Sequence, residues 1–282
     1  MSAPFAVRIA GVGVWSRELP GWDAARVWLE QSDAPLPPAG AARPAPSLLP
    51  PTERRRAPDS VLLAIEAAQQ ACAHASCDPA TLPHVFASAY GDLAINDYLC
   101  ATLVDSPNEV SPTKFHNSVH NAPAGYWAIA TGCGRSSTAL SAGADTFGAG
   151  LLEAALTAAA ERTPTLLVAY DVAATGLLAQ IIPCDAPFAV AFVLTPDVDA
   201  GDVGARAAVS DADATPTPGR VAPRLTLAAA ALAPGTNVLH ASYARNPAAR
   251  SLPLLAALAR RRDSHLHLAA GPALALSLEI SF

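Results

Sequence analysis

Residues 111–154 of this 282-residue chain read SPTKFHNSVHNAPAGYWAIATGCGRSSTALSAGADTFGAGLLEA. The segment predicts a polar loop with two histidines, a helix of small residues, a short strand over 136–141, a tight turn and a long alanine-rich helix over 145–161. A strand that leads through a tight turn into a helix is the building unit of layered α/β proteins. We therefore expect an α/β fold around this segment.

Further apolar runs on both sides of the segment predict more strands. Stretches such as LLVA and AVAFVL are apolar without interruption, which is typical of strands covered on both faces. The runs that we expect to form strands are 6–14, 84–90, 165–172 and 188–195. Their alternation with helical patterns predicts a layered sheet.

Two helices are predicted between the first strands. One begins near Asp59, a residue type that favours the N-cap, and places Val61, Ile65 and Cys72 at helical spacing, so Cys72 is expected in the core. The other contains Ile95, Leu99 and Leu103. Residues 33–58 are dense in proline and predict an extended surface loop.

The pattern weakens after residue 196. Residues 197–223 are rich in Asp, Ala, Gly and Pro and predict a linker or long loop. Beyond them, 224–232 and 265–281 predict two strands, with a helix over 252–262 between them. The chain is thus expected to comprise a main unit over 1–196, the linker over 197–223 and a short β-α-β segment over 224–282.

Composition limits the classes of partner. The formal net charge is −6 and no basic stripe is present, so nucleic acid is not an expected partner. The most apolar long stretch, 142–160, contains Asp145 and Glu153 and predicts a buried helix rather than a membrane span. No signal-peptide pattern opens the sequence, and the five scattered cysteines favour reduced thiols, so we expect a cytoplasmic location.

The pair Gly11 and Gly13 lies in the first apolar run and invites a dinucleotide-binding interpretation. The third glycine of that motif is missing, because position 16 is Ser16, and no glycine-opened helix follows directly. A strand that ends in a tight turn is the favoured interpretation.

Four segments together carry a resemblance to a known family. They read PPTERRRAPDSVLLAIEAA (50–68), VFASAYGDL (85–93), SPTKFHNSVHNAPAGYWAIATG (111–132) and FGAGLLEAA (147–155). They resemble the β-ketoacyl synthase-like chain length factors found in aryl polyene pigment gene clusters. The resemblance implies a thiolase-like layered fold of the α-β-α-β-α type. A full ketosynthase has two similar halves, and this chain is shorter than that, so the second half is expected to be abbreviated.

The resemblance also implies that the turn before the long helix matches the position of a catalytic nucleophile. Catalytic ketosynthases hold their nucleophilic cysteine there, and the matching position is at or near Gly143, between Ala142 and Ala144. No cysteine lies between residues 134 and 183. Condensation by this route needs a thiolate at a helix N-terminus, and glycine preserves the turn without supplying one. We therefore expect no catalytic residue, metal or cofactor in this chain.

Partners follow from the same resemblance. Ketosynthases pair through the strand that matches Ser137, Thr138, Ala139, Leu140 and Ser141. The segment before it is implied to reach the partner's acyl tunnel, with Thr113, Phe115, His116, Ser118, His120 and Asn121. An active ketosynthase is thus the expected heterodimer partner. An acyl carrier protein is the second expected partner, with Arg54, Arg55 and Arg56 as its contact, although a solvated turn explains these arginines equally well.

Other interpretations remain open for the histidines. His116 and His120 have the i, i+4 spacing of a zinc pair but lack a third ligand, and hydrogen bonds to the loop backbone are the plainer role. A self-sufficient acyltransferase or thioesterase could combine either histidine with a serine, although no G-x-S-x-G motif is present. The candidate serines are Ser118, Ser137 and Ser141. A homodimeric protein that binds an acyl ligand is a third possibility.

The remaining candidates have weaker patterns. His265 and His267 alternate along an expected strand and share one face, either as a catalytic pair or as a solvated strand edge. Asp171 and Asp185 have no histidine or serine beside them in the sequence. Cys133 is expected to be a small buried residue rather than a displaced nucleophile.

Overall fold

The computed structural model of the protein describes residues 4–31, 34–197, 222–231 and 241–282. These residues form one eight-stranded sheet with the order β3-β2-β4-β5-β1-β6-β8-β7. Strand β2 is parallel to β3 and β4, and the other pairs are antiparallel. The strands are β1 (Phe5–Trp15), β2 (His84–Ala87), β3 (Ser137–Leu140), β4 (Thr165–Asp171), β5 (Phe188–Pro196), β6 (Arg224–Ala230), β7 (Ser264–Gly271) and β8 (Leu274–Ser281).

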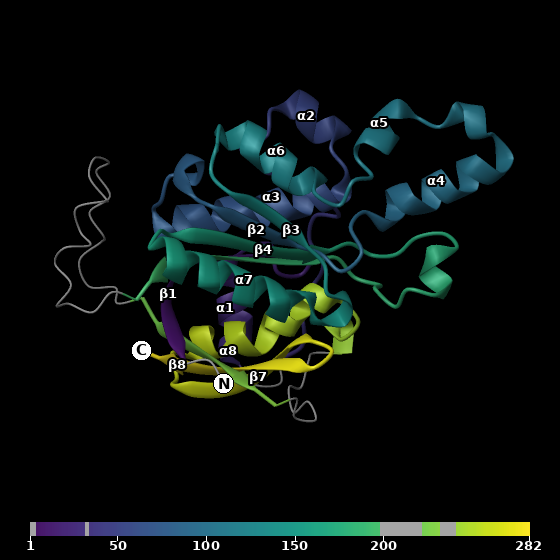
Figure 1. The fold of residues 1–282 in the computed structure, drawn as a ribbon. Coiled ribbons are helices and arrows are strands. Elements are labelled where there is room, and N and C mark those ends of the chain that lie inside the picture. The colour runs from purple at the N-terminus through teal and green to yellow at the C-terminus, as the bar shows by residue number, and fades with distance from the viewer. Residues whose placement is uncertain (1–3, 32–33, 198–221, 232–240) are drawn as a thin grey trace.

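Helices cover the first half of the sheet on both faces (Figure 1). They are α1 (Trp22–Glu30), α2 (Pro51–Arg56), α3 (Asp59–Ala75), α4 (Leu93–Asp105), α5 (Pro112–His116), α6 (Ala122–Thr131), α7 (Thr146–Glu161) and α8 (Leu252–Arg260). Helix α3 packs on one face, and α7 packs on the other. Because β7 also contacts α7, the second half of the sheet forms another layer beyond this helix.

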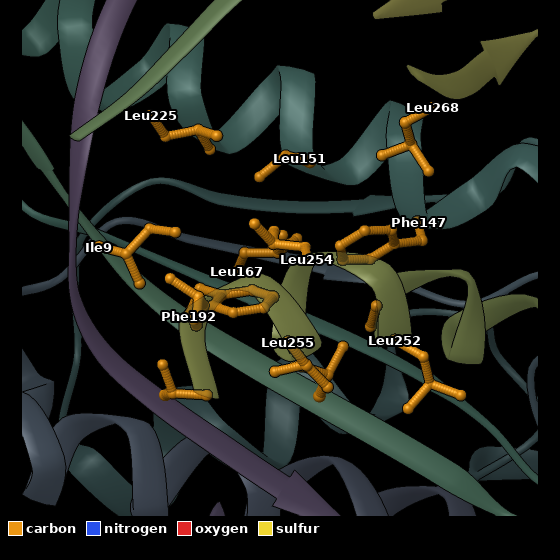
Figure 2. Packing of buried hydrophobic residues seen from close by; sticks show 14 of the residues in the cluster. Ile9, Phe147, Leu151, Leu167, Phe192, Leu225, Leu252, Leu254, Leu255 and Leu268 are labelled. Atoms are coloured by element: carbon orange, nitrogen blue, oxygen red, sulfur yellow. The ribbon is translucent and has the colours of Figure 1, made fainter. Parts of the chain in front are cut away.

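The core between these two β layers is apolar (Figure 2). Phe147 and Leu151 of α7 meet Phe192 of β5, with the rings of Phe147 and Phe192 6.2 Å apart between centroids. Leu254 of α8 and Leu268 of β7 close the cluster from the other side. Each such side chain contributes about 1.5–3 kcal/mol by leaving water, so α7 is firmly fixed between the layers.

The last three strands have one apolar and one polar face. Leu276 and Leu278 of β8 are buried, whereas Glu279 beside them is exposed and pairs in register with the exposed His265 of β7. An antiparallel sheet with this alternation is stable with one face in water. Among the described residues, no helix is long and apolar enough to cross a membrane.

Gly11 and Gly13 serve helix–strand packing. A Cβ atom at Gly11 would lie 2.2 Å from the main-chain oxygen of Ala71, and one at Gly13 would lie 2.0 Å from that of Ala67. Only glycine therefore allows α3 to approach β1 this closely. The predicted strand is confirmed, and its glycine pair opens no nucleotide-binding helix.

Several expectations about local structure were wrong. Residues 265–281 form two strands, because the chain turns at Pro272 and Ala273. Helix α3 begins at Asp59, as predicted, but its N-cap is Pro58 rather than Asp59, whose carboxylate pairs with Arg43 at 2.5 Å. The proline-dense loop ends in the helix α2, and proline at the first helical position suits a helix start. Helices α1 and α5 were not predicted.

The expected linker lies almost wholly outside the described residues, since 198–221 are not among them. On its far side, β6 pairs with β1, so the C-terminal strands continue the sheet of the N-terminal part. The division of the chain into a main unit, a linker and a C-terminal segment stays a prediction.

Candidate functional site

The turn before α7 has the backbone of a sharp elbow. Gly143 adopts φ +57°, a left-handed conformation that L side chains rarely adopt, and a Cβ atom there would meet nothing within 4 Å. The buried Thr146 hydroxyl accepts a hydrogen bond from the Ala142 N–H at 2.9 Å and donates one to the Gly143 carbonyl at 2.7 Å. Thr146 therefore fixes the turn, and the turn favours glycine for conformation rather than for lack of space.

No thiol lies in this turn. Cys72 and Cys133 are buried, as expected, and the Cys133 thiol donates a hydrogen bond to the Leu82 carbonyl at 3.3 Å. Burial raises the pKa of Cys184 to about 12, so this thiol stays protonated at neutral pH. Of the five cysteines only Cys100, on α4, is exposed. None of them is placed as an activated nucleophile at the N-terminus of α7.

The turn after β2, residues 88–91, is held from several elements. Asp171 at the end of β4 uses Oδ1 to accept hydrogen bonds from the Ser88 hydroxyl at 2.9 Å and from the N–H groups of Ala89 and Tyr90 at 2.9 and 3.2 Å. His120 Nε2 lies 2.8 Å from the Ser88 carbonyl oxygen. These bonds join the end of β4 and the turn before α6 to the 88–91 turn.

The Asp171 carboxyl group is buried. Burial raises its pKa to about 7, and the hydrogen bonds from Ser88 and the main chain oppose that rise. Its Oδ2 atom has no hydrogen-bond partner among the described residues.

Asn246 holds the backbone at the end of β4, because its Nδ2 donates to the main-chain carbonyls of Asp171 and Ala186 at 2.9 and 2.8 Å. Sequence reasoning missed Ser88 and Asn246; only the Asn-Pro dipeptide at 246–247 signalled a turn.

The elbow and this turn are directly connected. The Ser141 hydroxyl, just after β3, donates a hydrogen bond to the Ala89 carbonyl at 3.1 Å. Asp185, the other aspartate considered, is exposed and lies 3.9 Å from Arg245. Of the two aspartates, only Asp171 therefore belongs to the hydrogen-bonded group around the 88–91 turn.

The histidines of the 113–121 segment do not form a catalytic pair with a serine. His116 is exposed at the end of α5 and His120 lies in the following turn, so the two do not share a helix face. The Ser118 hydroxyl donates to the Phe115 carbonyl at 2.8 Å, and the Ser141 hydroxyl is engaged at Ala89. In the described part of the chain, no group of three metal-ligating side chains is placed to hold a metal ion.

Strand β3 is the free edge of the sheet as far as the structure describes it. The N–H groups of His84 and Ser88 donate to the carbonyls of Ser136 and Leu140, so the even-numbered residues of this edge face β2. The main-chain groups of Ser137 and Ala139 consequently point outward, while those of Thr138 face β2. Such an edge is a template for pairing with another chain.

The three helices that precede β3 in the sequence, α4, α5 and α6, carry exposed apolar side chains. Phe115 on α5 is 65% exposed, Ile129 on α6 is 85% exposed and Val104 on α4 is 83% exposed. Helices α4 and α5 project from the body of the molecule (Figure 1). The neighbouring Leu103 and Val119 are exposed as well. Thr113 is also exposed on α5, and Asn121 is the N-cap residue of α6 without a side-chain capping bond.

The three consecutive arginines lie on α2. Arg54 is engaged locally, because its Nη1 donates to the carbonyls of Ala45 and Pro46, both at 3.3 Å. Arg55 and Arg56 are exposed.

The two histidines of β7 lie away from the turn. His265 and His267 are on the exposed face, opposite α7, and His265 Nε2 lies 2.7 Å from the Ser277 hydroxyl of β8. Their ring centroids are 4.9 Å apart. The structure therefore does not bring them to the elbow.

Comparison with known proteins identifies the scaffold. The family model described as β-ketoacyl synthase, N-terminal domain, matches residues 28–245. No curated protein matches the sequence significantly. Among solved structures, one chain of the complex between the ketosynthase ApeO and its chain length factor ApeC from Xenorhabdus doucetiae is 21% identical, with a TM-score of 0.69 over 97% of this chain and 99% of that chain.

Two further structures have the same fold. A chain of the AntDE:AntF complex, a type II PKS acyl-carrier protein with its ketosynthase bound to the hexaketide, is 10% identical with a TM-score of 0.69 over 99% of both chains. A β-ketoacyl synthase from Burkholderia phymatum STM815 is 16% identical with a TM-score of 0.55, over 92% of this chain and 71% of that chain. The α/β, thiolase-like fold, shorter than a full ketosynthase, is thereby confirmed. With its family model matched over most of its length, the chain belongs to the β-ketoacyl synthase N-terminal domain family.

Proposed function

We propose that this protein is a non-catalytic, ketosynthase-like subunit of the chain length factor type. It pairs with an active β-ketoacyl synthase and helps to shape the acyl pocket of that enzyme. The observation that carries the proposal is the turn before α7, where Ala142, Gly143 and Ala144 keep a sharp backbone elbow but offer no thiol. Thiolate chemistry has no nucleophile at this position.

The free edge of β3 supports a pairing role. It presents outward main-chain groups at Ser137 and Ala139, and exposed apolar side chains lie on α4, α5 and α6. A strand edge without a partner and exposed large apolar side chains are typical of an association surface. Two of the similar structures are a ketosynthase with its chain length factor and a ketosynthase with its acyl-carrier protein. We infer that an active ketosynthase covers this edge here.

The pocket role rests on the segment that follows α4. Phe115 extends from α5 into solvent and is large enough to narrow a tunnel in a partner that covers it. The other proposed lining residues are Thr113, His116, Ser118, His120 and Asn121. A steric limit of this kind discriminates about 1–3 kcal/mol per methylene.

The substrate follows from this assignment. The complex would extend polyene or fatty acyl chains carried by an acyl carrier protein, as in aryl polyene biosynthesis, in the cytoplasm and without a cofactor of its own. Arg55 and Arg56 are exposed on α2 and suit an acidic carrier protein, whereas Arg54 is bound to its own loop. The acyltransferase or thioesterase alternative gains no support, because the hydroxyls of Ser118 and Ser141 each donate a hydrogen bond to a main-chain carbonyl oxygen and not to a histidine.

The experiment is a reconstitution with ketosynthases that carry the elbow cysteine and come from the same genome. The chain and each ketosynthase are purified alone and together, and their masses are measured by size-exclusion chromatography with light scattering. We expect a 1:1 complex with one such ketosynthase. A chain that stays monomeric with all of them, or that forms only homodimers, contradicts the proposal.

A further inference from the structure

The C-terminal end of α3 brings two cysteines together. Ser76 adopts a left-handed conformation with φ 52°, and its N–H donates to the Ala73 carbonyl at 3.1 Å. The N–H of Cys77 donates to the Cys72 carbonyl, also at 3.1 Å. These two bonds form the Schellman motif, in which the side chains of the two outer residues often make contact. In this chain the two outer residues are Cys72 and Cys77.

The two side chains lie in reach of one another. Cys77 Sγ is 3.6 Å from the Cys72 carbonyl oxygen. Cys72 belongs to the buried cluster under α3, and Cys77 packs against that cluster from the surface. The thiols also share a hydrogen bond. Two cysteines with bonded main chains and adjoining thiols can form a disulfide with little movement of the backbone.

The two thiols differ in environment and therefore in reactivity. Cys72 is 4% exposed, whereas Cys77 is half-buried. The hydrogen bond from one thiol to the other lowers the pKa of Cys77 and, together with burial, raises the pKa of Cys72. Because the thiolate is the reactive form of cysteine, Cys77 is the better nucleophile of the two. A reactive cysteine beside a second thiol that can resolve it is the arrangement of redox-sensitive pairs.

From this geometry we infer that Cys77 and Cys72 form a reversible disulfide on exposure to hydrogen peroxide. The Cys77 thiolate attacks one peroxide oxygen, the O–O bond breaks, and the hydroxide released takes up the proton of the Cys77 thiol as water. Cys77 is then a sulfenic acid. The Cys72 sulfur attacks the Cys77 sulfur, the S–O bond breaks, and the hydroxide leaves as water with the Cys72 proton. Two thiols are oxidised, and one peroxide is reduced to two waters.

The position of the pair indicates what oxidation does. The last turn of α3 packs directly on β1, where a Cβ atom at Gly11 would lie 2.8 Å from the Cβ atom of Ala75. A disulfide across residues 72–77 fixes the end of the helix that makes this contact, and it protects Cys77 from irreversible oxidation. A peroxide suits the site because a small oxidant needs little access to a half-buried thiol. The inference is independent of the pairing role, since neither cysteine lies on β3 or in the elbow.

The test is mass spectrometry of the purified chain after treatment with hydrogen peroxide and alkylation of the remaining thiols. Cleavage before aspartate releases peptide 59–77, which contains both cysteines and no other. We expect this peptide to lose two hydrogen atoms and take up no alkyl group, and to accept two alkyl groups after reduction with dithiothreitol. The exposed Cys100 is the internal control. Full alkylation of peptide 59–77 at a peroxide concentration that oxidises Cys100 overturns the inference.

Variants separate the roles of the two thiols. Cys72→Ser removes the resolving thiol, so the sulfenic acid at Cys77 should persist and react with dimedone about tenfold or more above the wild type. Cys77→Ser should leave the buried Cys72 reduced. Cys100→Ser is the matched control and should form the disulfide as the wild type does. Thermal unfolding before treatment establishes that each variant is folded. No dimedone adduct on Cys77 in Cys72→Ser, or oxidation of Cys72 in Cys77→Ser, contradicts the assignment.

Discussion

The Asp171 carboxylate accepts a hydrogen bond from the Ser88 hydroxyl at 2.9 Å, which ties the end of β4 to the turn after β2. The same turn receives the Ser141 hydroxyl from the elbow side. The buried carboxyl group therefore helps to position the backbone beside the elbow without any contact to a nucleophile. Its role in this chain is structural, and that role has a measurable pH dependence.

Asp171 should make the protein less stable as the pH rises from about 4 to 7. Burial raises its pKa from 3.8 to about 7 in the folded protein, so within this window the unfolded chain is ionised while the folded chain keeps its proton. The folded state then binds more protons, and stability falls by up to ~1.4 kcal/mol per pH unit from this group. The measurement is the free energy of unfolding in urea between pH 4 and 8.

Asp171→Asn isolates this contribution, because the amide oxygen can accept the same hydrogen bonds and does not titrate. We expect the stability of the wild type relative to this variant to fall from pH 4 to 7 and to level off above. Asp185→Asn, at an exposed aspartate, should follow the wild type. A constant difference between wild type and Asp171→Asn across the range would show that Asp171 is ionised when folded.

The two histidines of the 113–121 segment should differ in their effect on stability. His120→Ala removes the bond to the Ser88 carbonyl and is expected to cost about 1 kcal/mol. His116→Ala, at an exposed side chain, should be neutral within about 0.5 kcal/mol. Denaturant unfolding measures both. An acyl-thioester hydrolysis activity that both changes abolish would support a self-sufficient enzyme instead.

Ala139→Pro should prevent association through β3 and leave the fold intact. Position 139 faces outward, so proline removes an N–H group needed by a partner strand and none needed by β2. Light scattering of the mixture with the partner ketosynthase should show separate monomers. Ala139→Thr, which keeps the N–H group, is the control and should still associate. Full complex formation by the proline variant would place the interface elsewhere.

Phe115→Ala should lengthen the products of the reconstituted complex. On the proposed assignment the exposed ring narrows the partner's tunnel, so its removal should widen that tunnel. About 1–3 kcal/mol per methylene corresponds to a change of about tenfold or more in the ratio of longer to shorter chains. Mass spectrometry of the carrier-bound products measures this ratio. Phe115→Tyr keeps the bulk and should leave the distribution unchanged. The same distribution in all three proteins would remove Phe115 from the pocket.

Strands were the part of the fold that could be predicted, because buried strands appear as short apolar runs. The run in β5 and the small residues of α7 both predicted their elements. Shorter amphipathic elements were missed: α1 follows Pro20 and Gly21, and its buried Trp28 and Leu29 form a face too short to stand out as periodic. The hairpin of β7 and β8 was mistaken for one strand because only Gly271 and Pro272 interrupt the strand pattern.

The candidate site was predicted only in outline. The absence of a thiol near Gly143 can be read directly from the sequence, since it concerns one local segment. The contact between Ser88 and Asp171 joins residues 83 positions apart, and the hydrogen bond from Ser141 to Ala89 joins residues 52 positions apart. Neither follows from local pattern, because each is a consequence of how distant elements pack.

The condensation assay with malonyl- and acyl-carrier protein tests the absence of a working nucleophile most directly. The chain alone, the partner ketosynthase alone and the complex are compared for formation of the β-ketoacyl product. We expect no product from the chain alone, and product from the complex that disappears when the partner's elbow cysteine is replaced by alanine. Product formation by the isolated chain, or by the complex with that cysteine replaced, would contradict the account.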